Sequence, residues 1–125
     1  MTIWLAIAAG GALGSLVRHA TNVIVHRTVG ETVPHATAIV NVVGCLMIGV
    51  LAGLISAGHL RLSESARAFV FVGVLGGFTT FSSFGLDTFT LVRGGAIAVA
   101  AGNVVGQVVI GLASVFIGYR IATSL

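Results

Sequence analysis

The segment GGFTTFSSFG (residues 76–85) places glycines, four hydroxyl residues and three phenylalanines together in a chain that is otherwise almost entirely apolar. Each glycine in a helix interior costs about 1 kcal/mol relative to alanine. We therefore expect the helix that contains this segment to unwind at Gly76 and Gly77. Unwinding releases backbone carbonyls, which must find partners inside the protein because lipid offers none. A bound Na⁺ ion is one such partner, as at the broken helices of membrane transporters.

The composition indicates that the chain uses a lipid bilayer as its solvent. It has 125 residues, of which 57% are hydrophobic and only 7% charged. So few charges do not cover the surface of a soluble domain. The six basic residues are all arginine and form no cluster, so no nucleic-acid partner is expected. Cys45 is the single cysteine, which excludes an intrachain disulfide.

Four apolar runs are long enough to cross the bilayer, since a span needs about 20 residues. They extend over residues 3–25, 35–57, 67–92 and 96–119. The first run lacks a positively charged start, so we expect it to be retained rather than cleaved as a signal peptide. A polar loop around Glu31 joins the first two spans, Ser63 is a candidate N-cap for the third, and RGG (93–95) is a candidate tight turn. The sequence predicts one all-α, multi-pass membrane domain over residues 1–125.

The arginines give no orientation signal. Positive loop residues normally mark the cytoplasmic side, but each side of this chain receives three of them. Arg18, Arg27 and Arg93 fall on one side, and Arg61, Arg67 and Arg120 fall on the other. Such a chain is able to insert in both directions and pair head-to-tail with itself. The alternative is a weak bias fixed by other features of the sequence.

Small residues four apart are typical of helices that pack closely in membranes. The chain has three such glycine pairs, which suggests that its spans pack against neighbours, including those of another subunit. The pairs are Gly10 with Gly14, Gly49 with Gly53, and Gly102 with Gly106.

Polar side chains recur inside three of the four spans. Thr37 and Asn41 share a face of the second span, and Asn103 and Gln107 share a face of the fourth, because residues four apart lie on one side of a helix. The third span adds the hydroxyls around Ser83. Hydrogen bonds between helices are one explanation. The high desolvation cost of amides favours the other, a polar lane that conducts a small solute.

Phe81 and Phe84 are three residues apart and share a helix face. Phenylalanine in a membrane span is often only apolar filling. Its ring edge is electropositive, however, so edges turned into a narrow lane would solvate a small anion weakly. Asn41 would supply a stronger hydrogen-bond donor in the same lane.

No enzyme chemistry is indicated, because the spans contain no Ser-His-Asp set, no carboxylate pair and no phosphate-binding loop. A small multidrug exporter also has four spans, but it needs a carboxylate in its first span, which is absent here. A non-conducting assembly subunit is a further alternative. It would use the amides only for packing and would show no flux.

Three stretches together resemble the Fluc, or CrcB, family of fluoride-specific channels: GGALGSLVRH (10–19), TAIVNVVG (37–44) and GVLGGFTTFSSFGLDT (73–88). The resemblance covers essentially the whole chain. It implies a dual-topology antiparallel homodimer, with the third helix broken, that exports fluoride passively across the plasma membrane. Some family members pair with a paralogous subunit instead.

The resemblance also implies roles for individual residues. Asn41, with Thr37 one turn before it, resembles the pore asparagine. Phe81 and Phe84 resemble the paired pore phenylalanines, and Ser83 a hydroxyl of the polar track beside them. The remaining candidates are Arg18 at a vestibule, Gly76 and Thr79 with backbone carbonyls on a structural Na⁺ at the dimer centre, and Asn103 and Gln107 in the fourth-span part of the pore, where other members often carry Ser or Thr.

Overall fold

The computed structural model describes residues 2–30 and 34–125, so Glu31 lies outside the described residues. Every regular element in those ranges is a helix. The elements are α1 (Thr2–Val29), α2 (His35–Ser56), α3 (Glu64–Arg67), η1 (Ala68–Leu75), α4 (Gly76–Phe78), α5 (Phe81–Arg93) and α6 (Ile97–Thr123). Four stretches are long and apolar enough to span a membrane: α1, α2, the stretch from Glu64 to Arg93, and α6. This confirms the predicted all-α chain with four spans.

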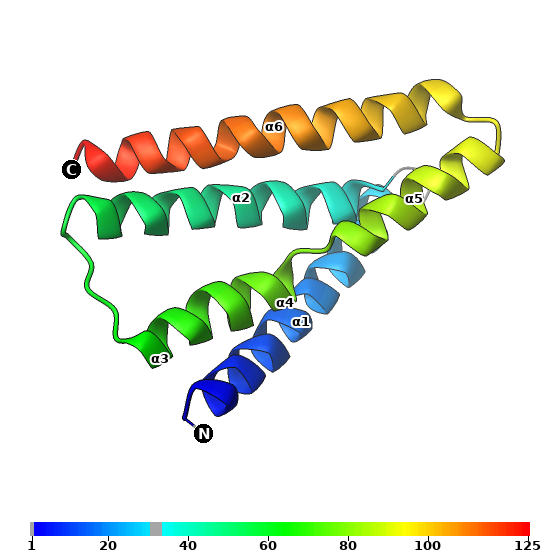
Figure 1. Cartoon of the computed structure of the whole chain (residues 1–125). Helices are drawn as coiled ribbons and strands as arrows, with labels where there is room; N and C mark the ends of the chain where they lie inside the picture. Colours follow the sequence, from blue (N-terminus) through cyan, green and yellow to red (C-terminus); the bar gives the residue numbers. More distant parts are fainter. Residues whose placement is uncertain (1, 31–33) are drawn as a thin grey trace.

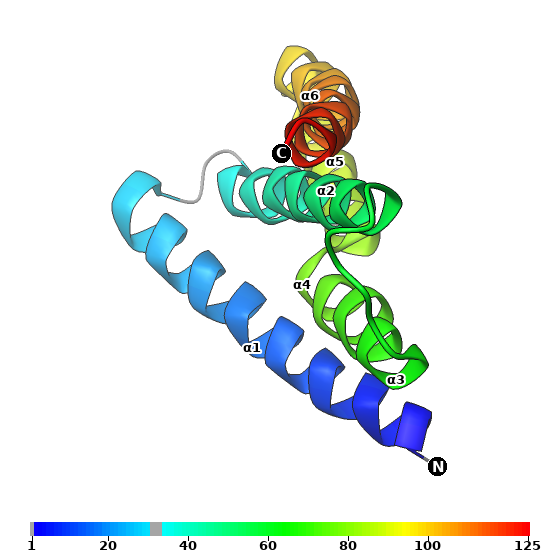
Figure 2. The same ribbon diagram turned by 90° about the vertical axis from the view of Figure 1, so that its left-hand side faces the viewer.

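The spans pack mainly as two pairs. Helices α2 and α6 run side by side along their length, and α1 lies against the stretch formed by α3, η1 and α4, as two perpendicular views show (Figures 1 and 2). Helix α5 leaves the second pair and lies against α6. The third span therefore packs against α1 with its first half and against α6 with its second half.

Glycines explain how closely the helices within each pair approach. A Cβ atom at Gly10 or Gly14 of α1 would overlap backbone carbonyl oxygens of η1, and one at Gly49 of α2 would overlap the Val115 carbonyl of α6. The first two predicted glycine pairs therefore pack as expected. A Cβ atom at Gly102 or Gly106 of the third pair would meet no atom within 4 Å in the described structure, so the packing of this pair against another subunit stays a prediction.

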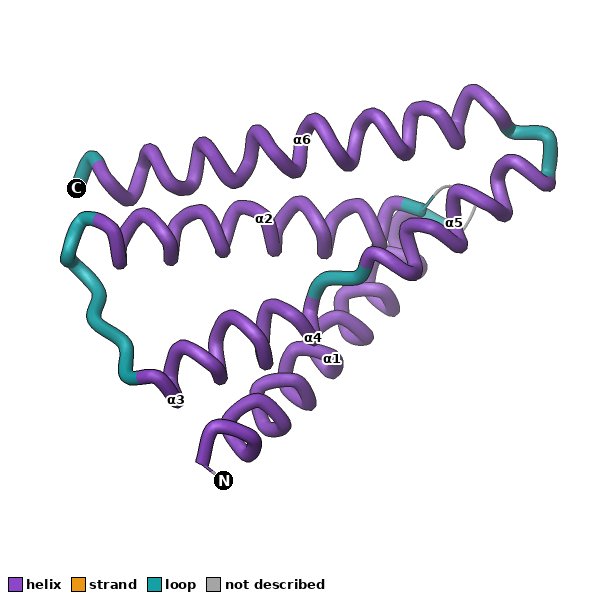
Figure 3. Tube along the Cα trace, viewed as in Figure 1, coloured by secondary structure: helices purple, strands orange, loops and turns teal. Residues whose placement is uncertain are grey.

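Two residues with extended backbone separate α4 from α5 (Figure 3). Thr79 has φ −80° and ψ 161°, and Thr80 has φ −154° and ψ 113°. We call Thr79 and Thr80 the extended segment. The prediction that the chain unwinds at the glycines is wrong, because Gly76 and Gly77 are helical. Gly77 instead allows close packing, since a Cβ there would lie 2.6 Å from the Gly11 carbonyl oxygen.

Hydrogen bonding in η1 is of the π type over eight residues, a conformation that is rare and often found near functional sites. The sequence pattern does not predict this π conformation. Leu75, the last residue of η1, accepts hydrogen bonds at its carbonyl from both the backbone N–H and the hydroxyl of Thr79. These bonds fix the start of the extended segment.

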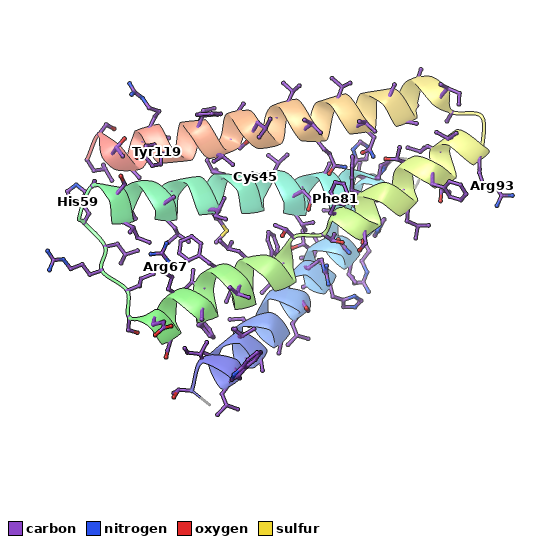
Figure 4. The ribbon with its side chains drawn as sticks, in the orientation of Figure 1. Cys45, His59, Arg67, Phe81, Arg93 and Tyr119 are labelled. Atoms are coloured by element: carbon purple, nitrogen blue, oxygen red, sulfur yellow. The ribbon has the colours of Figure 1, made fainter. Side chains whose placement is uncertain are left out.

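The ends of the third span follow the sequence signals. Ser63 accepts a hydrogen bond at its hydroxyl from the Ala66 N–H, as a helix N-cap does. At the other end Gly95 has φ +78°, a left-handed conformation that glycine adopts readily. Figure 4 shows Arg67 near the first end of this span and Arg93 at the second end, so the two cations lie toward opposite faces of the membrane.

Only a thin core is buried within one chain. Val40, Leu75 and Phe78 are among the few buried large side chains, and Thr37 and Thr80 are buried with them. Most of the large apolar side chains are exposed instead, including Trp4 (77%) and Phe81 (83%). This exposed apolar surface needs lipid or another chain to cover it.

Candidate functional site

The site is built where Asn41 of α2 meets the extended segment. The Asn41 Oδ1 atom accepts a hydrogen bond from the Thr80 N–H at 2.9 Å, and Asn41 Nδ2 donates to the Thr80 carbonyl oxygen at 3.1 Å. The Asn41 Oδ1 atom thus replaces the acceptor that a continuous helix would provide for the Thr80 N–H. Thr80 also caps α5, since its Oγ1 accepts from the Ser83 N–H at 3.2 Å. These contacts account for the end of α4 and the start of α5.

A row of side chains extends this contact along α6. Asn41 Nδ2 also donates to Gln107 Oε1 at 2.9 Å, and Gln107 Nε2 donates to Asn103 Oδ1 at 2.8 Å. Asn103 Nδ2 then donates to Thr88 Oγ1 at 2.9 Å, and the Thr88 hydroxyl donates to the Phe84 carbonyl oxygen at 2.8 Å. We call Asn41, Gln107, Asn103 and Thr88 the amide relay. It connects the second, third and fourth spans.

The direction of every bond in the amide relay is fixed by the backbone. The Thr80 N–H is only a donor and its carbonyl only an acceptor, so Asn41 has one permitted orientation. The Phe84 carbonyl at the far end likewise forces Thr88 to donate. Between these anchors Gln107 and Asn103 each accept from one neighbour and donate to the next.

Two cavities flank the relay. The first, about 440 Å³, lies between α2, η1, the extended segment and α5. Phe81 and Phe84 line it with ring centroids 5.4 Å apart and ring planes at 45°, and Figure 4 places Phe81 close to α2 where α5 begins. The second cavity, about 310 Å³, lies between α2 and α6 and contains Asn103. Gln107 lines both cavities.

The extended segment leaves the four carbonyls of residues 76–79 without their usual helical donors, and the donors of two of them are bound elsewhere. In a continuous α-helix Gly76 would accept from the Thr80 N–H, and Thr79 would accept from the Ser83 N–H. Here Asn41 Oδ1 takes the first donor and Thr80 Oγ1 the second. The Thr79 carbonyl receives one hydrogen bond from Arg18 Nη1 at 3.3 Å. Gly76 and Thr79 both line the first cavity.

The predicted candidates are therefore mostly brought together. Asn41, Gln107, Phe81 and Phe84 surround the first cavity, and Asn103 lines the second. Three candidates line neither cavity, and Arg18, predicted at a vestibule, is one of them, since its Nη1 donates to the Thr79 carbonyl. Thr37 is buried in α2 with 9% of its surface exposed, and Ser83 accepts a hydrogen bond at Oγ from Thr80 Oγ1 at 2.9 Å.

Sequence reasoning missed the two threonines that anchor the relay. In the sequence Thr80 is one of four hydroxyl residues in GGFTTFSSFG, although a threonine just before a helix start is a recognisable N-cap signal. Thr88 gave no such signal. Its hydroxyl bonds to its own helix at Phe84, as many membrane threonines do, and only the packing of α6 on α5 brings it to Asn103.

Comparison with known proteins identifies relatives of the whole chain. Residues 5–119 match the family model described as "CrcB-like protein, Camphor Resistance (CrcB)". A protein of Opitutus terrae named "Fluoride-specific ion channel FluC" is 48% identical over 126 residues, which cover 100% of this chain and 96% of that protein.

Two further relatives carry the same name. The Rhodospirillum centenum protein is 47% identical over 94% of this chain and 93% of its own length, and the Thermus thermophilus protein is 42% identical over 100% and 98%. The resemblance seen in the sequence motifs is thereby confirmed. Because the family model spans most of the chain and these relatives match it almost end to end, the chain belongs to the CrcB family.

Proposed function

We propose that this chain forms a fluoride-selective channel of the plasma membrane, through which fluoride leaves the cytoplasm passively. The relatives are named as ion channels, and this chain is likewise a channel protein and not an enzyme. One observation carries the proposal. A pair of phenylalanines and a directed row of amides meet at one cavity, inside helices of membrane-spanning length.

The lining of the first cavity suits a small anion that must enter and leave quickly. Its residues carry no formal charge, so nothing there binds an anion as tightly as a buried arginine would. The edges of Phe81 and Phe84 offer weak electropositive contact. Amide N–H groups add directional donors. Conduction requires such moderate binding, because an ion that is held too strongly does not leave.

We further propose that two chains assemble as an antiparallel dimer, with the same chain inserted in both orientations or with a paralogous subunit as partner. Three observations support this. The loop arginines are balanced, and Phe81 is 83% exposed although it lines the cavity. A Cβ atom at Gly102 or Gly106, which line the second cavity, would also meet no atom of another helix of the same chain within 4 Å. A partner chain would complete the cavity wall around Phe81.

We also propose that a structural Na⁺ ion, which is not transported, lies at the centre of this dimer. The residues fit such an ion, because the carbonyls of Gly76 and Thr79 have lost their helical donors and hard cations prefer oxygen ligands. When bound, Na⁺ would neutralise these carbonyl dipoles and connect the two chains. Arg18 occupies one lone pair of the Thr79 oxygen and leaves the second for the ion.

Fluoride efflux from liposomes that contain the purified protein tests the channel. We expect rapid efflux of fluoride and not of chloride. Asn41→Asp should abolish it, because a carboxylate oxygen would then face both the Thr80 carbonyl and Gln107 Oε1. An intact folded dimer without fluoride flux would disprove the function.

A second experiment addresses sodium. Replacing Na⁺ with a large organic cation should weaken dimer assembly, measured by size exclusion in detergent, and should reduce flux with it. Thr79→Val keeps the carbonyl and serves as the control, with unchanged sodium dependence. If dimer assembly and flux are both indifferent to Na⁺, the sodium assignment is wrong while the channel function stands.

A further inference from the structure

The wall of the second cavity contains one ionisable side chain, that of His35. The other residues that line this cavity, between α2 and α6, are apolar or carry neutral amides. His35 is the first residue of α2, and its side chain is exposed. Histidine side chains are the ones that ordinarily change charge between pH 5 and 8. Protonation of His35 therefore gives the wall of this cavity its one positive charge.

The second cavity extends from His35 to the amide relay. Asn103 and Gln107 of α6 belong to its wall, and Gln107 also lines the first cavity. Ala38 and Val42 follow His35 along the same face of α2, so the wall beside the imidazole is apolar. Because His35 stands at the end of a helix of membrane-spanning length, it lies at the outer end of the cavity and the relay at the inner end.

The other ionisable groups near α2 lie off this wall. The elements that pack against α2 are α1, η1, α4, α5 and α6. Helices η1 and α4 contain no ionisable residue. The ionisable residues of the other three are Arg18, His19, His26 and Arg27 of α1, Asp87 and Arg93 of α5, and Tyr119 and Arg120 of α6. Within the described residues none of these lines the second cavity, so His35 alone sets the charge of its wall.

We infer that fluoride passes through the second cavity and that the proton on His35 accelerates its entry. This inference rests on the proposed channel function. His35 acts as an entry residue and not as a tight site. An exposed positive charge at the mouth of a cleft raises the local concentration of anions and their rate of arrival, while the neutral interior leaves the ion free to move on.

Fluoride efflux from liposomes at two pH values tests this role. We choose about pH 7.5 and about pH 5.5, on either side of the range in which histidine changes charge. The flux should rise roughly two- to fivefold at the lower pH, the effect of one unit charge a few ångströms away in water. High salt should reduce the increase, because it screens exposed charges. Protein-free liposomes measure the leak of neutral HF through lipid, which is subtracted.

Three variants assign the response to its residue. His35→Gln should show the high-pH rate of the parent at both pH values, and His35→Arg should show the low-pH rate at both. His59→Gln is the matched control. His59 is exposed and lines neither cavity, and Figure 4 shows it at the opposite end of α2. This variant should keep the pH response of the parent.

Two results would overturn the inference and leave the channel function standing. One is fluoride flux in the parent that is equal at the two pH values. The other is a pH response that persists in both His35→Gln and His35→Arg, which would assign the response to another group. If His35→Gln does not fold, as circular dichroism would reveal, His35→Arg carries the test. If the parent shows no fluoride flux, the channel function and this inference fail together.

Discussion

Two residues of the first cavity contribute to the protein in different ways. Asn41 binds both polar groups of the Thr80 peptide and is part of the fold. Phe81 is 83% exposed, and its ring pairs with that of Phe84. Loss of a buried hydrogen-bonded amide typically costs about 1–3 kcal/mol, whereas truncating an exposed side chain costs little. Substitution of Asn41 should therefore lower both the stability of the protein and its fluoride flux, whereas substitution of Phe81 should lower the flux alone.

Phe81→Ile makes this separation testable. We expect fluoride flux to be lost, because isoleucine has no electropositive ring edge, and the thermal unfolding midpoint of the monomeric chain to stay unchanged. Phe89→Ile is the matched control on the same helix. Phe89 is 57% exposed and lies outside the first cavity, so its variant should conduct normally. Normal flux in Phe81→Ile would remove the aromatic pair from the mechanism.

The amides were predictable as site residues and the threonines were not. Asn41, Asn103 and Gln107 are costly to bury in a membrane, so their presence in apolar spans already indicated a shared polar lane. Thr80 and Thr88 carry hydroxyls that bond readily to nearby backbone, and a sequence does not distinguish that use from a link between helices. The order and direction of bonds in the relay depend on packing and came only from the structure.

At the scale of one element, the two threonines of the extended segment form different hydrogen bonds with their hydroxyls. Thr80 Oγ1 caps α5 by accepting from the Ser83 N–H, while the Thr79 hydroxyl donates back to Leu75 in the preceding helix. The Thr79 methyl also packs against Gly44. Valine keeps the shape of threonine and removes only the hydroxyl.

Thr80→Val should destabilise the start of α5 by about 1 kcal/mol, the usual cost of losing an N-cap. We expect faster amide hydrogen exchange at residues 81–84 and a lower unfolding midpoint. Thr79→Val should change exchange there much less, since its hydroxyl bond lies within the first half of the span. Equal exchange in the two variants would argue against capping by Thr80.

Helix packing gives a second prediction at this scale, from two glycines of α1. A Cβ atom at Gly14 would lie 2.9 Å from the Phe78 backbone nitrogen and overlap the Val74 carbonyl, while one at Gly11 meets no atom within 4 Å. Gly14→Ala should therefore cost about 1–3 kcal/mol through overpacking. Gly11→Ala should be neutral or stabilising, because alanine favours the helix. Thermal unfolding in detergent measures both, and a neutral Gly14→Ala would contradict the packing of α1 against η1.

Hydropathy predicted the four spans because apolar length is all that a membrane requires of a helix. It did not predict where the third span changes conformation. The glycines suggested unwinding at residues 76 and 77, yet Gly77 packs closely against α1 and the helix ends one residue later, at Phe78. That end depends on Asn41, which is 39 positions away from Thr80 in the sequence. Local propensity contains no information about such a partner.

At the scale of the whole molecule, the distribution of arginines bears on the proposed antiparallel assembly. Arg18 contacts the Thr79 carbonyl at the centre of the third span rather than a loop. Without it the count of three against three becomes two against three, which is still a small bias. A chain with so weak an orientation signal should respond strongly to added charge, since a few positive residues at a chain end are able to reverse topology.

Two pairs of lysines test this dependence from opposite ends. Ser124→Lys with Leu125→Lys adds charge beside Arg120, and Thr28→Lys with Val29→Lys adds charge beside Arg27. Each double variant should insert in one orientation only and lose fluoride flux, because an antiparallel dimer needs both. Co-expression of the two should restore flux, since each supplies the orientation that the other lacks. Glutamine at the same positions is the uncharged control. The fluoride resistance of the cells measures flux, and a reporter fused to the C-terminus measures orientation. Full activity of either lysine variant alone would show that one orientation is sufficient.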